Sequence, residues 1–257
     1  MMDHRDVGRM WDENATLWTP LARAGHDIFR DYVNTPAFLE MLPDVQGLKG
    51  LDIGCGEGHN TRLIAGRGAR LTAIDISGVF LKHALELEKS EPSGIRYLHA
   101  SAQELPFRSE SFDFVVATMS FMDAPEHELI MSEAHRVIRP GGFLQFSITH
   151  PCFQTPRWKW VYDDSGRKVA VECGAYFDPP PHEVEEWIFR DAESQGRFRV
   201  PVFRRTLSEW LNLLLDTGFR IARVCEPRAD GATIERYPAL ADTRIIAFFL
   251  LILCRKA

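Results

Sequence analysis

Leu51-Asp52-Ile53-Gly54-Cys55-Gly56-Glu57-Gly58 is the stretch that decides the fold, because a short apolar run ends there in a loop with three glycines. The residues that follow, Asn60 to Ala65, are predicted to form the first turns of a helix. Glycine lets the backbone adopt positive φ and approach a ligand closely, and a loop that leads into a helix presents free N–H groups. The stretch therefore predicts a ligand-binding loop between a strand and a helix.

The spacing of these glycines separates two kinds of nucleotide site. A dinucleotide-binding loop follows the pattern G-x-G-x-x-G, which would place its last glycine at position 59, where this chain has His59. The third glycine is instead Gly58, and Asp52 lies two positions before the first one. The spacing argues against an NAD(P) oxidoreductase. A tight turn that binds no ligand remains an alternative on this evidence.

Composition narrows the classes of partner. The chain has 257 residues, of which 45% are hydrophobic, and a formal net charge of −6. The length fits one large domain, or one domain with an insertion. The acidic balance argues against partners such as nucleic acid or an anionic membrane surface, which basic proteins bind. We therefore expect a small-molecule substrate.

The cysteines and the apolar runs bear on the compartment. The five cysteines form no C-x-x-C pair, so neither a disulfide framework nor a metal site is predicted. The N-terminus is polar and has no apolar signal region, and the run from Ile245 to Cys254 is too short to span a membrane. We expect a cytoplasmic protein with reduced thiols.

Strand and helix signals alternate from residue 48 to residue 149 and again after residue 204. The predicted strands are Leu48–Ile53, Leu71–Ile76, Ile95–Ala100, Phe112–Thr118, Phe143–Thr149, Phe219–Cys225 and Ile245–Leu253. The predicted helices are Gly58–Gly66, one capped by Ser77, Glu126–Ile138, and one from Thr206 to about Thr217; residues 226–242 are predicted to be a loop. This alternation predicts an α/β fold with a doubly wound, mostly parallel sheet of seven strands.

Two segments lie outside this alternation. Residues 1–47 are predicted to form an N-terminal helical cap, which either packs onto the main domain, residues 48–257, or covers the ligand cleft. Residues 150–203 are rich in aromatic residues and proline, and we expect them to form a β-rich flap or an irregular lid after the fifth strand. The aromatic side chains of this insertion form either a small core of their own or a wall of the substrate pocket.

Four further motifs occur along the chain in a fixed order. They are Asp75 at the end of the second strand, Ala100-Ser101-Ala102-Gln103-Glu104-Leu105-Pro106-Phe107, Ser111-Phe112-Asp113-Phe114-Val115-Val116-Ala117, and Arg136-Val137-Ile138-Arg139-Pro140-Gly141-Gly142-Phe143-Leu144. With the glycine loop, these motifs resemble those of the class I S-adenosylmethionine (SAM) methyltransferases of the small-molecule type. The resemblance covers residues 48–149 and 204–257. It implies an antiparallel last strand, SAM as the methyl donor and S-adenosylhomocysteine as the product.

The resemblance also implies a cofactor site at the carboxyl ends of the strands, where ligands of open α/β sheets bind. Its expected residues are Asp52, Gly54, Cys55, Gly56, Gly58, Asp75, Ile76, Ser101, Ala102, Gln103, Thr118 and Met119. Asp75 is expected to accept hydrogen bonds from the ribose hydroxyls. Ser101 stands where the family commonly has Asp, so the adenine contact falls to a hydroxyl or a backbone carbonyl.

The acceptor site is predicted less directly. His150, at the carboxyl end of the fifth strand, is the candidate general base, with His26, Asp123 and Tyr176 as alternatives. The competing interpretation is that His150 only hydrogen-bonds nearby backbone. The expected substrate-binding residues are Trp11, Trp18, His150, Tyr176 and Arg204, and Arg204 or Arg205 is a candidate for holding a substrate carboxylate.

The sequence thus predicts a SAM-dependent methyltransferase that modifies a small molecule, at oxygen or nitrogen rather than at carbon, as a monomer or homodimer. The alternative is a catalytically silent SAM-binding protein that acts as a regulator or partner subunit. The glycine loop and Asp75 are equally expected in both.

Overall fold

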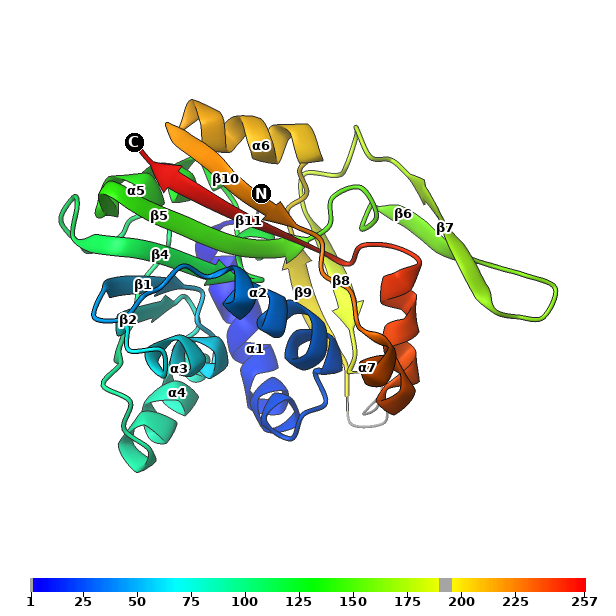
Figure 1. The fold of residues 1–257 in the computed structure, drawn as a ribbon, viewed down its shortest axis with the longest axis horizontal. Helices are drawn as coiled ribbons and strands as arrows, with labels where there is room; N and C mark the ends of the chain where they lie inside the picture. Colours follow the sequence, from blue (N-terminus) through cyan, green and yellow to red (C-terminus); the bar gives the residue numbers. More distant parts are fainter. Residues whose placement is uncertain (1, 190–195) are drawn as a thin grey trace.

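The structure is a computed structural model that describes residues 2–189 and 196–257. Its centre is a seven-stranded sheet in the order β10-β11-β5-β4-β1-β2-β3 (Figure 1). The strands are β1 (Lys49–Ile53), β2 (Arg70–Asp75), β3 (Arg96–His99), β4 (Phe112–Thr118), β5 (Ile138–Thr149), β10 (Phe219–Cys225) and β11 (Phe249–Lys256). The neighbouring strands β5, β4, β1, β2 and β3 all pair in parallel. β11 is antiparallel to both β5 and β10. The predicted fold class is confirmed.

Helices cover both faces of the sheet because the central strands are apolar on both faces. Along β4, Val115 and Ala117 join a core with α5 (His127–Val137) and α6 (Leu207–Asp216). The alternate residues Phe114 and Val116 join a second core with α2 (Thr35–Met41), α3 (His59–Ala65) and α4 (Gly78–Ser90). This arrangement is the doubly wound architecture that the alternation predicts, with a core on each side of one sheet.

The predicted helix starts are confirmed by their caps. The hydroxyl of Ser77 accepts a hydrogen bond from the Phe80 N–H at the start of α4. Thr206 and Glu209 form a reciprocal capping box at the start of α6. These local signals depend on residues within one helical turn, which is why sequence is enough to place them.

Three predicted assignments are wrong: the starts of two strands and the loop before the last strand. β5 begins at Ile138 and runs through the Pro140-Gly141-Gly142 turn, with a register shift against β4, whereas the sequence pattern predicts a start at Phe143. The predicted loop 226–242 contains α7 (Gly231–Arg236), capped by Asp230, and the 3-10 helix η4 (Pro238–Arg244). β11 therefore begins only at Phe249, where it pairs with Thr149 of β5, rather than at Ile245.

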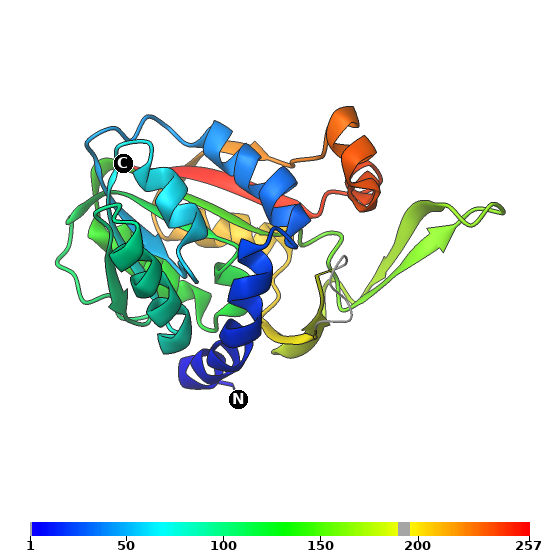
Figure 2. The same cartoon turned by 90° about the horizontal axis from the view of Figure 1, so that it is seen from below.

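The N-terminal segment consists of α1 (His4–Arg23), the π-helix η1 (Arg30–Asn34) and α2. Figures 1 and 2 both place α1 beside the hairpin of β8 (Glu183–Trp187) and β9 (Phe198–Val202). The side-chain amide of Asn14 bonds both backbone groups of Arg199, at 2.8 and 3.2 Å. Two segments separated by 185 residues in the sequence are thereby joined beside the sheet.

The insertion contains two hairpins that lie apart from each other. β6 (Arg157–Tyr162) and β7 (Lys168–Gly174) form an arm that projects away from the body, whereas β8 and β9 lie against α1 (Figures 1 and 2). The β-rich character of the predicted flap is thus observed in both hairpins, although positions 190–195 of the predicted lid lie outside the described residues. Within the described ranges, no helix has the length and apolar character needed to cross a membrane.

Candidate active site

The glycine loop connects β1 to α3 at the carboxyl edge of the sheet. Gly54, Gly56 and Gly58 have φ angles of 73°, 55° and 89°, which L side chains rarely adopt. The N–H groups of Gly54 and Cys55 donate to the Ile74 carbonyl at 2.9 and 3.0 Å, so β2 holds the loop. Its shape is therefore set by glycine conformation and by the neighbouring strand.

Asp75 ends β2 directly beside this loop. One of its carboxylate oxygens accepts the Gly56 N–H at 2.7 Å, and the other accepts the Ser77 N–H at 2.8 Å. Burial raises the pKa of Asp75 to about 6, although these two hydrogen bonds oppose the shift. Each carboxylate oxygen can accept a further hydrogen bond, so Asp75 can also bind two ligand hydroxyls.

The loops after β3 and β4 continue the same edge. The Ser101 hydroxyl accepts the Gln103 N–H at 3.2 Å, and the Gln103 amide donates to the Pro125 carbonyl at 3.0 Å. Met119 has a φ of 54°, and its N–H donates to the Ser147 carbonyl of β5 at 3.0 Å. A left-handed methionine carries backbone strain, and such strain tends to occur at functional sites.

These loops line a cavity of about 260 Å³. The predicted cofactor residues that line it are Gly54, Cys55, Gly56, Asp75, Ile76, Ser101, Ala102, Gln103, Thr118 and Met119. Four separate loops thus converge on one space, as the resemblance implies.

The opposite wall of the cavity is aromatic and comes from α1 and the β8–β9 hairpin. Trp11, Trp18 and Trp187 all line it. The Trp18 ring also packs on Phe198, with 4.7 Å between the ring centroids. Aromatic residues of the insertion thus form a small core with α1, and Trp187 also lines the cavity, whereas a substrate-binding role for this wall stays a prediction. The two predicted tryptophans, Trp11 and Trp18, line the cavity, and their contact with a substrate stays a prediction.

Three residues predicted to bind ligand do not line the cavity, so their ligand contacts stay predictions. Asp52 accepts the Thr61 hydroxyl at 2.6 Å, and burial raises its pKa to about 7. Gly58 packs behind the loop, where a Cβ would come within 2.5 Å of the Tyr97 hydroxyl. Tyr176 accepts the Leu207 N–H at 2.7 Å beside a separate cavity of about 20 Å³. All three hold local structure.

Arg204 lines the cavity as predicted, but its guanidinium already has partners. It forms ion pairs with Glu183 and Glu185 of β8, and its Nε donates to the Gln154 carbonyl at 3.1 Å. Arg205 instead binds His127 and Glu128 of α5. Neither arginine is thus free for a substrate carboxylate, because protein carboxylates or an imidazole already occupy both.

His150 does not face the cavity, so its predicted role as the general base is not supported by the geometry. Its side chain is buried, its Nδ1 accepts the Cys152 N–H at 3.2 Å, and its Nε2 lies 2.7 Å from Glu226. Burial lowers its pKa, so the ring is the neutral tautomer that donates to Glu226. The preceding residue, Thr149, lines the cavity instead. Successive residues of a strand point to opposite faces, so the side chain of His150 points away from the cavity that Thr149 lines.

Replacing His150 with Ala is therefore expected to leave kcat within about threefold of the wild-type value, because general-base losses of roughly 100-fold or more require contact with the acceptor. The free energy of unfolding should fall by about 1–2 kcal/mol, because two hydrogen bonds of a buried ring are lost. Urea unfolding and methyl-transfer kinetics measure both quantities. A kcat at least about 100-fold lower in a folded variant would restore the catalytic role.

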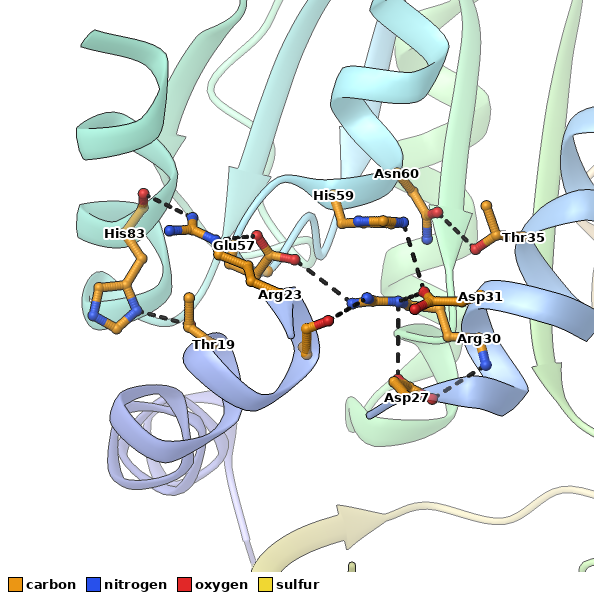
Figure 3. Close-up of polar contacts among 12 residues, drawn as sticks. Thr19, Arg23, Asp27, Arg30, Asp31, Thr35, Glu57, His59, Asn60 and His83 are labelled. Atoms are coloured by element: carbon orange, nitrogen blue, oxygen red, sulfur yellow. Dashed lines mark hydrogen bonds and ion pairs between the residues drawn. The ribbon is translucent and has the colours of Figure 1, made fainter. Parts of the chain in front are cut away.

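The sequence did not reveal how the cap is joined to the glycine loop. Figure 3 shows Arg23 and Arg30 converging on Glu57, with N–O distances of 3.1 and 3.6 Å. The Thr35 hydroxyl of α2 also donates to Asn60 of α3 at 2.8 Å. The three charged residues belong to separate segments, so no regular spacing in the sequence predicts that they form ion pairs. The cap is thereby tied to the loop that the glycines shape.

Two buried polar side-chain atoms of residues that line the cavity have no hydrogen-bond partner within the described residues. The Asn34 side-chain nitrogen and the Thr118 hydroxyl are buried, and within the described part of the chain neither makes a hydrogen bond. Both residues line the cavity. Leaving a buried polar group unpaired costs about 1–3 kcal/mol, which a bound polar ligand relieves. The cavity is therefore built for a ligand with polar atoms.

Comparisons with known proteins agree with this geometry. Residues 51–146 match the family described as methyltransferase domain. A solved S-adenosylmethionine-dependent methyltransferase from Mesorhizobium loti superposes with a TM-score of 0.71 and 29% identity, covering 86% of this chain and 96% of that one.

Among curated proteins, the fatty-acid O-methyltransferase of Mycolicibacterium smegmatis is 28% identical over 52% of this chain and 49% of its own length. The demethylmenaquinone methyltransferase of Listeria welshimeri is 29% identical over 72% of this chain and 75% of its own length. The chain thus spans about half the length of the first relative and three quarters of the second.

The chain therefore has the class I, Rossmann-like methyltransferase fold and matches a methyltransferase domain over residues 51–146, which implies SAM as the methyl donor. The residues present fit that donor. Asp75 offers a buried carboxylate for ribose hydroxyls, and Gly56, where an added Cβ would meet nothing within 4 Å, leaves room for the amino-acid part beside the loop. Asn34 and Thr118 provide the unpaired polar atoms.

Proposed function

We propose that the protein transfers a methyl group from SAM to an oxygen or nitrogen of a small molecule with an apolar or aromatic body. The observation that carries the proposal is the unlike character of the two cavity walls. The sheet edge supplies glycine backbone and Asp75, whereas α1 and the β8–β9 hairpin supply Trp11, Trp18 and Trp187. A polar donor fits the first wall, and an apolar acceptor fits the second.

SAM supplies a methyl group activated by its positively charged sulfur. The chain's own residues then have to bind, orient and exclude water, because methyl transfer is an in-line displacement that rewards alignment. Asp75 and the glycine loop hold the donor in one orientation, and the Gly56–Asp75 hydrogen bond fixes their relative position. Trp11, Trp18 and Trp187, which form the tryptophan wall of the cavity, keep water from the acceptor side.

The relatives support an apolar acceptor. The Mycolicibacterium protein is named for fatty acids and the Listeria protein for demethylmenaquinone. Both are largely hydrocarbon molecules. In this chain Val200 and Val202 add aliphatic surface to the tryptophan wall, which suits a molecule of this character.

Calorimetry followed by labelled transfer tests the proposal. SAM and S-adenosylhomocysteine are each expected to bind at one site per chain, and NADH is not, because the glycine spacing differs from a dinucleotide loop. Label from SAM should then reach members of phenol, amine and carboxylate panels. Binding of SAM with no transfer to any panel would favour the silent SAM-binding alternative. Absence of SAM binding by folded protein would contradict both.

A further inference from the structure

Asp123 is a buried carboxylate that the proposed function leaves unexplained. It ends the 3-10 helix η2 (Phe121–Asp123), which directly follows the carboxyl end of β4, and it lines the cavity. Only 5% of its surface is exposed. Its backbone N–H donates to the Ser120 carbonyl at 3.1 Å, but its carboxylate has no hydrogen bond or ion pair within residues 2–189 and 196–257. A buried acid of this kind needs a partner from outside the chain.

The charges around Asp123 are unbalanced. Across the cavity, Glu185 also lines the space, and both Glu183 and Glu185 bind the guanidinium of Arg204. Two of these three carboxylates pair with Arg204, and Asp123 has no cationic partner within the described residues. Burial and the charge of Glu185 together raise the pKa of Asp123 well above its usual range. A positive charge bound between these groups would balance the cluster.

Aromatic rings meet the same space. Trp187 lies two residues after Glu185 on the same face of β8, and Trp11 and Trp18 line the cavity from α1. The faces of tryptophan rings attract cations as well as apolar groups. A buried acid in the same cavity as such rings is a combination that recognises amines, because the acid favours a positive charge and the rings favour both the charge and an apolar body.

We propose that the methyl acceptor is an amine with an apolar or aromatic body, and that its nitrogen binds Asp123 while its body lies against the tryptophan wall. This inference rests on the proposed function and names its substrate class. In the balanced reaction a nitrogen–carbon bond forms and the sulfur–carbon bond of the donor breaks, with its electron pair going to sulfur. Before this bond forms, the Asp123 carboxylate takes one proton from the bound ammonium, which frees the nitrogen lone pair that makes the new bond.

Other acceptors fit these residues less well. A carboxylate acceptor would meet Asp123 and Glu185, and Arg204, the arginine on this side, is already paired with two glutamates. An alcohol would hydrogen-bond Asp123 but would supply no positive charge to favour its ionised form. An ammonium supplies both the hydrogen bond and the charge, and hydrogen bonds between charged groups are the stronger kind.

Three probes with one carbon skeleton test the inference without any turnover: 2-phenylethylamine, 2-phenylethanol and phenylacetate. Their binding is measured by calorimetry on protein saturated with S-adenosylhomocysteine. The amine is expected to bind at least about tenfold more tightly than the alcohol, since a charge-assisted hydrogen bond contributes roughly 1.5–3 kcal/mol. Phenylacetate is expected to bind most weakly. Equal binding of amine and alcohol would overturn the inference.

Asp123→Asn provides the matched test of the residue. It keeps the shape of the side chain but removes the charge, so affinity for the amine should fall at least about tenfold and approach that of the alcohol. Asp216→Asn, the same change at an exposed position near the end of α6, should leave both affinities unchanged. An Asp123→Asn variant that keeps the full preference for the amine would overturn the inference.

The pH dependence gives a second readout. The raised pKa of Asp123 predicts that wild-type affinity for the amine increases with pH, below the pKa of the amine itself, as the carboxyl ionises. Glu185 of β8 acts on Asp123, and Arg204 lines the same cavity. His127 of α5 bonds the Phe121 carbonyl of η2, and burial lowers its pKa to about 4, so that it stays neutral. Asp123→Asn should lose this dependence, and a variant that keeps it would count against the assignment.

The same measurements separate this inference from the proposed function. If S-adenosylhomocysteine does not bind, the proposed function fails. If it binds and the three probes are not distinguished, only the amine assignment fails.

Discussion

Replacing Asp75 with Ala is expected to weaken binding of S-adenosylhomocysteine by about 100-fold or more. The carboxylate both faces the cavity and accepts the Gly56 and Ser77 N–H groups at 2.7 and 2.8 Å. Its loss therefore removes the expected ribose contacts and also releases the glycine loop. Two hydrogen bonds to a charged group contribute roughly 1.5–3 kcal/mol each, and 1.4 kcal/mol corresponds to about tenfold in affinity. Calorimetric titration measures the change.

Two controls sharpen this result. Asp75→Asn keeps the side-chain shape and one acceptor oxygen, so its loss should be smaller than that of Asp75→Ala. Asp216→Ala, at an exposed position, should bind as the wild type does. Because burial raises the pKa of Asp75 to about 6, wild-type affinity should also fall as pH drops through that value, since the protonated acid accepts less well. An Asp75→Ala variant within about threefold of wild type would contradict the assignment.

Replacing Gly54 with Ala is expected to damage both stability and binding. Gly54 has a φ of 73°, and a Cβ there would lie 2.4 Å from the Ser120 Cβ and 2.7 Å from its hydroxyl. Ser120 cannot easily withdraw, because its hydroxyl donates to the Ile53 carbonyl at 2.8 Å. Overpacking and the unfavourable backbone together should lower the free energy of unfolding by about 1–3 kcal/mol or more. We expect affinity for S-adenosylhomocysteine to fall at least about tenfold, because the loop must move.

Gly166 offers the matched control for this substitution. Its φ is 78°, close to that of Gly54, but an added Cβ would meet nothing within 4 Å. Gly166→Ala should therefore show the backbone cost alone and bind normally. Adding Ser120→Gly to Gly54→Ala removes the colliding atoms and should recover part of the lost binding. If Gly54→Ala behaves like Gly166→Ala in chemical unfolding and calorimetry, the collision is not important.

The elements and the cofactor edge were predictable because their signals are local. The glycine loop, the Ser77 cap and the Thr206 capping box each depend on residues within one turn of each other. The carboxyl ends of parallel strands meet at one edge, so the sequence alone places Asp75 and Ser101 together. The loop 226–242 was missed as helix because α7 is short and its capping Asp230 follows no clear apolar period.

The acceptor side was harder because it depends on packing between distant segments. The ion pairs of Arg23 and Arg30 with Glu57 join α1 and η1 to the glycine loop. The β8–β9 hairpin contacts α1, although the two are far apart in the sequence. Asp123 was one of several candidate bases in the sequence. Its burial, its lack of a partner in the described chain and its position opposite Glu185 distinguish it now.

By itself, the amino-acid sequence determined the doubly wound sheet, the glycine loop and the acidic residue that ends β2, since each follows from short-range backbone preferences and from the alternation of apolar residues. Only the tertiary structure decided which side chains enter the cavity. Thr149 and Ile53 line it while their neighbours His150 and Asp52 do not, because adjacent residues point to opposite sides at a strand end. The facing wall was likewise decided by the packing of α1 on β9, which no local pattern encodes.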